Sequence, residues 1–160
     1  METRSIIKSQ YYAAMAMLRQ AIENCPEALW EDASYNNPAW RLAYHTLIYT
    51  HFYLSPTEAD FKPWEKHRED MQLLGLTAPE GEAYSRAEIL AYLGLCLEAV
   101  EHQVDQMDLK AASGFEWLPF SKLELQFYNI RHIMQHTGEL YERLGATGGI
   151  ELGWVTQGQV

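Results

Sequence analysis

The stretch from Asn129 to Leu140, NIRHIMQHTGEL, places His132 and His136 four residues apart in a segment with helical periodicity. Four residues are one helical turn plus about 40°, so both imidazoles leave the same face of the helix. Two neutral imidazole nitrogens in that arrangement can bind one divalent metal ion. Because such a pair also arises by chance, the metal hypothesis needs a third ligand from elsewhere in the chain.

The bulk composition argues against nucleic acids and membranes as partners. The 160 residues predict one domain with a full core, and 22 acidic residues oppose only 12 Lys and Arg, with a net charge of −10. The apolar stretch Tyr11–Leu18 is too short to span a bilayer, and Met1–Arg4 does not begin a signal peptide. Cys25 and Cys96 lie far apart in apolar surroundings, as packed thiols do in a reducing compartment. We therefore expect a cytoplasmic protein.

Helical periodicity marks four segments, and no convincing strand interrupts them. These segments cover about residues 3–24, 38–54, 85–107 and 121–144. Asn37 can cap the second helix and Pro38 can take its first position, where a missing N–H costs nothing. Capping boxes open the third helix at Ser85–Glu88 and the fourth at Ser121–Glu124. Four long amphipathic helices predict an all-α fold, a four-helix bundle.

A long connection separates the second and third helices. It begins with another capping-box pattern, Ser55–Glu58, which predicts a short helical turn, and part of Trp64–Leu74 is also compatible with a helix. Connections of this length are unusual in compact domains and often carry function. The fourth helix is expected to end before Gly145. We divide the chain into a helical domain and a glycine-rich tail, residues 1–145 and 146–160.

Two histidines of the second helix, His45 and His51, are candidates for the third ligand. They are six residues apart, about 240° around a helix, so both cannot point into one site. Periodicity favours His51, which lies within the apolar stripe, over His45 at its edge. A histidine on an apolar face is, however, more often a hydrogen-bonded core residue than a ligand. The residues alone leave this choice open.

The order and spacing of these histidines resemble the DinB-like (DinB/YfiT) superfamily. The likeness covers about residues 38–144 and is carried by Tyr44-His45-Thr46-Leu47, Tyr53-Leu54-Ser55 and Asn129–His136. Members of the superfamily are four-helix bundles with one histidine on the second helix and an HxxxH pair on the last. The resemblance implies a metal site made of His45, His132 and His136. It places His51 outside that site.

Three neutral histidines would leave a divalent ion one open position for water or substrate, as catalytic metal sites do. Imidazoles suit Zn, Ni, Cu or Fe(II), and we expect Zn or Ni before Fe, Mn or Mg. The resemblance implies two activities: metal-dependent transfer of a low-molecular-weight thiol to an electrophile, and metal-dependent hydrolysis. We favour thiol transfer, because a coordinated thiolate needs little other machinery. The alternatives are a non-catalytic metal-binding protein of stress response or interaction, and a helical protein without a metal.

On its helix, the histidine pair lies away from the main apolar stripe, which consists of Leu123, Phe127, Ile130, Met134 and Tyr141. Asn129 and Glu139 share the histidine face and are candidate partners for the imidazole N–H groups. Glu139 is also a candidate general base, although a carboxylate on a polar face is usually only solvated. Without a metal, this face would be ordinary solvated surface. Apolar residues beside the stripe, Leu125, Tyr128 and Leu140, predict a homodimer, which light scattering at low concentration tests.

Overall fold

The computed structural model describes residues 3–75 and 81–158 of the protein. Over these residues the chain is all-α, as predicted, and no strand forms within them. The helices are α1 (Thr3–Asn24), α2 (Glu27–Trp30), α3 (Ala39–Leu54), α4 (Glu69–Gln72), α5 (Arg86–Gln106) and α6 (Lys122–Gly148). Four of them are long, whereas α2 and α4 are single turns.

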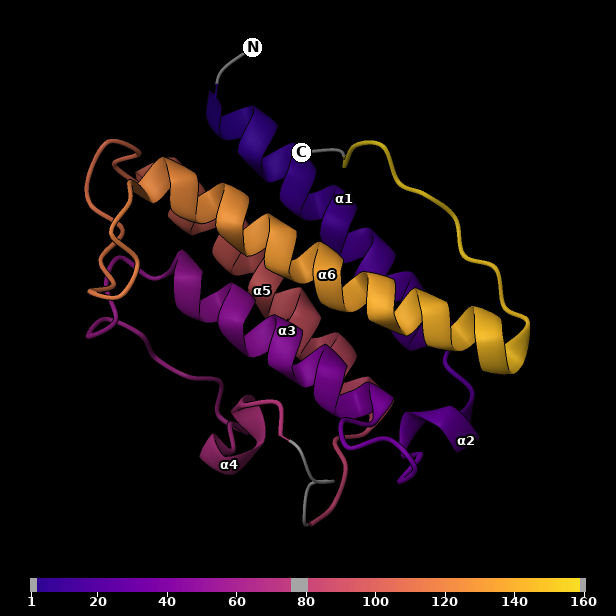
Figure 1. Ribbon diagram of the computed structural model, residues 1–160. Coiled ribbons are helices and arrows are strands. Elements are labelled where there is room, and N and C mark those ends of the chain that lie inside the picture. The colour runs from indigo at the N-terminus through magenta and orange to yellow at the C-terminus, as the bar shows by residue number, and fades with distance from the viewer. Residues whose placement is uncertain (1–2, 76–80, 159–160) are drawn as a thin grey trace.

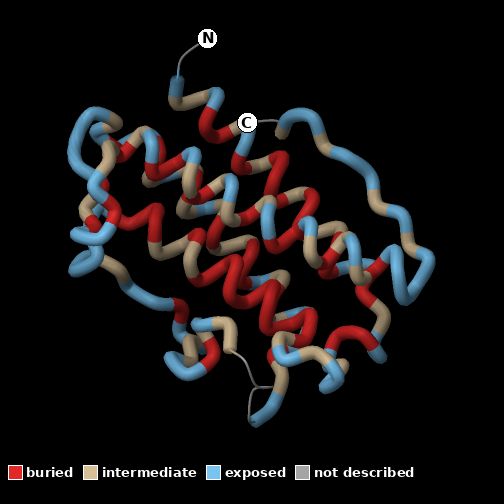
Figure 2. The backbone as a smooth tube through the Cα atoms, in the orientation of Figure 1, coloured by how far each residue is buried: buried red, intermediate tan, exposed pale blue. Residues whose placement is uncertain are grey.

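The four long helices lie side by side (Figure 1). Helices α5 and α6 each pack against both α1 and α3. The end of α3 lies beside the start of α6, so these two helices run antiparallel. Buried residues from all four helices face the space between them, and exposed residues lie outside (Figure 2). Burial of these apolar side chains, among them Leu18, Leu47 and Ile133, is the main force that holds the helices together.

Helix α3 is the most buried of the four long helices, because 13 of its 16 residues are buried. A helix that is covered on nearly all faces belongs to a protein interior, or to a membrane when it is long enough. No helix in residues 3–75 and 81–158 has the length and apolar character that crossing a membrane requires. Because α3 is buried, any polar side chain on it, His45 included, needs a partner inside the protein.

Asn37 does not cap α3, contrary to the prediction from sequence. The helix begins at Ala39 without a side-chain cap. The Asn37 amide instead donates from Nδ2 to the Gly75 carbonyl and accepts from the Gly75 N–H through Oδ1, both at 3.0 Å. The cap prediction is wrong because two backbone groups of the long connection replace the single helix N–H that a cap would bind.

The three capping-box patterns have different outcomes. Ser85 and Glu88 form the complete reciprocal box at the start of α5. Ser121 accepts from the Glu124 N–H at 3.2 Å, which is one half of the box. The box predicted at Ser55 does not form, because the Glu58 N–H donates to the Gly114 carbonyl at 3.2 Å, and the residues that follow form turns rather than a helix. Farther along the connection, the helix predicted within Trp64–Leu74 is confirmed as the single turn α4.

The fourth long helix ends later than predicted, at Gly148 and not before Gly145. The residue that ends it is Gly149, whose φ of 61° lies in the left-handed region that favours glycine. Its N–H donates to the Gly145 carbonyl at 3.1 Å. The tail that follows runs back beside α1, where the Gly158 N–H donates to the Ser9 carbonyl at 3.0 Å (Figure 1).

Candidate metal centre

His45 from α3 and His132 and His136 from α6 lie together between these two helices. Each offers a nitrogen, and the three nitrogens are within 4.8 Å of one another. His45 Nε2 and His132 Nε2 are 3.1 Å apart. Two ligands of a tetrahedral zinc ion at about 2.0 Å would be about 3.3 Å apart, so this pair already has the spacing of two ligands. The structure thus brings together the three histidines that the resemblance implied.

The helix geometry explains why the rings converge. His132 and His136 are one turn apart on α6, and their ring centroids are 4.7 Å apart. The His45 ring lies across from both, at 5.1 Å from the His132 ring and 4.8 Å from the His136 ring. Because α3 packs closely against α6, a single residue of α3 can face two successive turns of its neighbour.

The histidine face of α6 is its buried face. Periodicity had predicted the opposite, with the apolar stripe buried and the histidine face away from it, and that prediction is wrong. Leu125, Asn129, Ile133, His136 and Leu140 are buried. The stripe that looked more apolar is only half-buried, and Phe127 is 62% exposed. Hydrophobicity did not identify the buried face because polar residues lie on it: buried Gln126, for example, accepts a hydrogen bond from the Tyr11 hydroxyl at 2.9 Å. Since Leu125 and Leu140 are core residues, they no longer support self-association, and the homodimer stays a prediction.

His45 has a backbone partner that sequence reasoning missed. Its Nδ1 lies 2.7 Å from the Gln72 carbonyl oxygen in α4. A carbonyl can only accept, so Nδ1 carries the proton and Nε2 keeps its lone pair for the site. Every residue has a carbonyl, so residue type could not identify this contact. The length of the connection between α3 and α5 was the one signal that pointed to this segment.

Of the two side chains predicted to support the imidazoles, one lies beside a site histidine. Glu139 Oε1 is 3.2 Å from His136 Nδ1, but this nitrogen has no hydrogen-bond partner among the residues that the structure describes, so the supporting role of Glu139 stays a prediction. Asn129 is not a partner: it is fully buried, and its Nδ2 donates to the Thr50 carbonyl at 3.1 Å. Asn129 joins α6 to α3 inside the core, one turn along from the site.

The hydrogen bonds that His132 lacks are consistent with a cation bound between His132 and His45. The buried Nδ1 of His132 has no hydrogen-bond partner among the residues that the structure describes. If His132 Nε2 donated to His45 Nε2, His132 Nδ1 would be a buried acceptor without a donor. If Nδ1 carried the proton, two Nε2 lone pairs would face each other at 3.1 Å. Either state is costly for the protein alone, whereas a cation between the two nitrogens would match both lone pairs.

All three imidazoles are held in the neutral form that binds metals. Burial lowers the pKa of His45 to about 4. Burial, with the charges of the two neighbouring histidines, lowers the pKa of His132 to about 3. Burial also lowers the pKa of His136, although the Glu139 carboxylate opposes that shift. At neutral pH each ring therefore offers a lone pair without first losing a proton.

We expect the metal-free protein to become less stable as the pH falls from 6.5 towards 4. The pKa values of His45 and His132 are lowered from 6.5 to about 4 and about 3 on folding. The unfolded chain therefore takes up protons first, and stability that is complete above pH 6.5 is lost as the pH falls through the folded values. Urea unfolding between pH 7.5 and 4 measures this dependence.

The matched control for that measurement is His102, an exposed histidine of α5. His132→Gln should make the free energy of unfolding less dependent on pH in this window, whereas His102→Gln should leave the dependence as in the wild type. Equal pH dependence in the His132→Gln variant and the wild type would contradict the assignment.

His51 lies outside the histidine cluster. Its Nδ1 is 3.2 Å from the Tyr92 hydroxyl, and its ring packs edge-on against Phe61 at 5.2 Å between centroids. Periodicity favoured His51 as the inward residue, but His51 is only half-buried whereas His45 is buried, and the neighbours of His51 are aromatic side chains. It has the surroundings of a hydrogen-bonded core histidine, the alternative that the sequence had left open.

Tyr49 is a neighbour of the site that sequence reasoning missed. Its ring centroid lies 4.8 Å from that of His45 and 5.8 Å from that of His132. The spacing of four residues from His45 was an available signal, since it puts both side chains on one face of α3. Burial raises the pKa of the Tyr49 hydroxyl, so the phenol is neutral at physiological pH.

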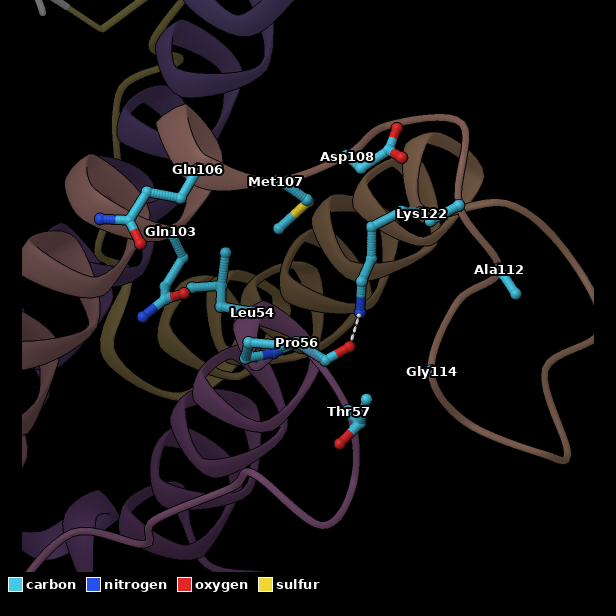
Figure 3. Close-up of a pocket in the computed structure, with 11 residues that line it drawn as sticks. Leu54, Pro56, Thr57, Gln103, Gln106, Met107, Asp108, Ala112, Gly114 and Lys122 are labelled. Atoms are coloured by element: carbon cyan, nitrogen blue, oxygen red, sulfur yellow. Dashed lines mark hydrogen bonds between the residues drawn. The ribbon is translucent and has the colours of Figure 1, made fainter.

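A cavity of about 510 Å³ lies at the other end of these helices, where α3 ends and α6 begins (Figure 3). Its walls include Leu54, Met107 and Lys122, and none of the three clustered histidines lines it. The ammonium of Lys122 donates to the carbonyls of Ser55, Pro56 and Ser113. These three bonds use all of its protons, so Lys122 joins segments of the chain and is not available to a ligand.

Comparisons with protein-family models, curated proteins and solved structures give no match. The candidate metal centre therefore depends on its own geometry and on the chemistry of its donor atoms.

Proposed function

We propose that the protein is a DinB-like four-helix bundle that binds one divalent metal ion through His45, His132 and His136. The observation that carries this proposal is the convergence of three neutral imidazole nitrogens, within 4.8 Å, from helices far apart in sequence. The order of the long helices and the place of the histidines on α3 and α6 agree with the superfamily pattern. A set of three imidazoles favours Zn or Ni over Mn or Mg, which prefer oxygen ligands.

We further propose that the centre is catalytic and transfers a low-molecular-weight thiol to an electrophile. Three protein ligands leave a coordination position open, and an ion bound there would lower the pKa of a thiol in that position. In the reaction, the sulfur bonds to the electrophilic atom, the leaving group departs with its bonding electrons, and the thiol proton passes to solvent. The protein's own contribution is orientation: the Gln72 carbonyl holds His45, and Glu139, 3.2 Å from His136 Nδ1, would orient His136.

Metal-dependent hydrolysis is the second candidate reaction, and the position of Glu139 favours thiol transfer over it. Hydrolysis benefits from a general base beside the attacking water. Glu139 contacts Nδ1 of His136, which is the ring nitrogen remote from Nε2. If Nε2 binds the ion, the carboxylate lies behind the ligand and acts on the ring's orientation. Thiol transfer needs no such base once the thiol has been deprotonated.

Two measurements test the proposed function. Mass spectrometry of protein purified without an affinity tag should find about one divalent ion per chain. A panel of thiols and electrophiles should then give a rate above that of the metal-free protein. Bound metal without any such rate would favour a non-catalytic metal-binding protein, and a specific partner in pull-downs would add to that conclusion. If the protein binds no divalent ion, the remaining alternative is the third one, a helical protein that has no metal site.

Glu139→Gln should weaken metal binding about tenfold, the lower end of the effect of removing a partner behind a metal-bound histidine. Glutamine keeps the size of the side chain but removes the negative charge 3.2 Å from His136 Nδ1. A competition titration with a chromophoric zinc chelator measures the affinity. Glu142→Gln, an exposed position on the same helix, is the control and should bind as the wild type does. Equal affinities in both variants would show that Glu139 does not support the site.

A further inference from the structure

We infer that Asn37 and Arg41 are positioning residues for His45 and act through the backbone segment Gln72–Gly75, here named the strap. This inference rests on the proposed metal site. The strap supplies the carbonyl that fixes the His45 ring, yet it belongs to a connection with little secondary structure of its own. Something must hold it against α3, and Asn37, just before that helix, and Arg41, in its first turn, do so.

Three carbonyls of the strap accept hydrogen bonds from side chains of residues 37–45. The Gln72 carbonyl accepts from His45 Nδ1 at 2.7 Å, and the Leu73 carbonyl accepts from Arg41 Nη2 at 2.8 Å. The Gly75 carbonyl accepts from Asn37 Nδ2 at 3.0 Å, and its N–H donates back to Asn37 Oδ1. Arg41 and His45 are one turn apart on α3, and Asn37 lies two residues before its first residue, so the three side chains meet the strap in succession.

Apolar packing also holds this part of the chain, since Met71 of α4 is buried in the core and Leu74 packs against it. Helix α4, which ends at Gln72, is a single turn and packs against α3. A helix of that length is not stable by itself in water. Its other end is also tied to α3, through the Tyr44 hydroxyl, which lies 2.5 Å from His67 Nδ1. The position of the Gln72 carbonyl therefore depends on side chains of α3 and of the residues just before it.

The position of that carbonyl matters because it selects the tautomer of His45. With the Gln72 carbonyl in place, Nδ1 is protonated and Nε2 is free to bind an ion. Without it, the ring can rotate or move its proton to Nε2, and that form cannot bind an ion through Nε2. Coupling of this kind is reciprocal. A metal ion that requires the bound orientation of His45 should in turn hold the strap more firmly.

Asn37→Ala tests the inference, with Asn24→Ala as the matched control. Asn24 is an exposed amide at the end of α1 and donates to the Gln20 carbonyl at 2.8 Å. The Asn37→Ala variant should bind Zn²⁺ about tenfold more weakly in a chelator competition. In the metal-free variant, nitrogen NMR of the imidazoles should show mixed tautomers for His45, where the wild type shows Nδ1–H. In the wild type, Zn²⁺ should slow hydrogen exchange of the strap amides.

Asn37→Asp provides a second variant, because it keeps the acceptor for the Gly75 N–H and loses the donor. Its zinc affinity should lie between those of the wild type and Asn37→Ala. Wild-type affinity and an unchanged His45 tautomer in Asn37→Ala would overturn the inference. A wild-type protein that binds no Zn²⁺ would overturn the proposed function. In that case the tautomer measurement, which needs no metal, still decides whether Asn37 positions His45.

Discussion

His45→Ala should abolish tight metal binding. The substitution removes one of three ligands and leaves the two histidines of α6. Zinc sites with four ligands bind with about 10–16 kcal/mol, or about 3 kcal/mol for each ligand. Loss of one ligand should therefore weaken binding at least about hundredfold. Metal content by mass spectrometry and the dissociation constant from chelator competition measure the effect.

The control for this experiment is His51→Ala, on the same helix. His51 lies beside Tyr92 and outside the cluster, so this variant should still bind one ion per chain. Retention of metal by His45→Ala together with its loss from His51→Ala would show that the wrong histidine has been assigned. Thermal unfolding gives an independent reading: an ion at 100 times its dissociation constant stabilises the folded protein by about 2.7 kcal/mol. His45→Ala should lose that stabilisation and His51→Ala should keep it.

Lys122→Met should lower the free energy of unfolding by about 2 kcal/mol, because the buried carbonyls of Ser55 and Ser113 lose their donor and each costs about 1–3 kcal/mol. Lys122 is 5% exposed and is bonded to the carbonyls of Ser55, Pro56 and Ser113. Removing a buried charge recovers part of that cost, which keeps the expected loss near the lower end of the sum. Methionine fills most of the same volume, so the change reports on the lost hydrogen bonds. Urea unfolding at constant pH measures it.

Lys110→Met is the matched control, since Lys110 is an exposed lysine of the loop that precedes α6. It should change the stability by less than about 0.5 kcal/mol. Lys122 is ten residues before His132, about 15 Å along α6. Lys122→Met should therefore bind the metal with wild-type affinity at pH 7.5 in buffer without denaturant. Equal stabilities of the two lysine variants would show that the three carbonyls find other donors.

The helices themselves were largely predictable from local sequence. The first runs from Thr3 to Asn24 as expected, and Pro26 follows its end. The box at Ser85 forms as predicted, because both of its hydrogen bonds join residues only three apart. Prediction failed where a distant group competed for the same atoms. Asn37 binds Gly75 rather than the start of α3, and the Glu58 N–H binds the Gly114 carbonyl rather than the Ser55 side chain.

The buried face of α6 could not be read from hydrophobicity. Its core side carries Gln126, Asn129 and Thr137, all fully buried, while Phe127 is largely exposed. Buried polar residues are tolerated when they find partners, and those of Gln126 and Asn129 are Tyr11 on α1 and Thr50 on α3. Because these partners lie on other helices, a pattern within α6 cannot reveal them.

The sequence by itself determined the helices and put His132 and His136 one turn apart, because both depend on residues within a few positions of each other. The residues alone left His45 and His51 as alternatives, and a family resemblance implied His45. Only the tertiary structure placed His45 Nε2 3.1 Å from His132 Nε2 and set the Gln72 carbonyl against His45 Nδ1. Those contacts join positions far apart in the chain, and one of them uses a carbonyl that every residue has. Packing of α3 against α6 and the strap therefore decided the site.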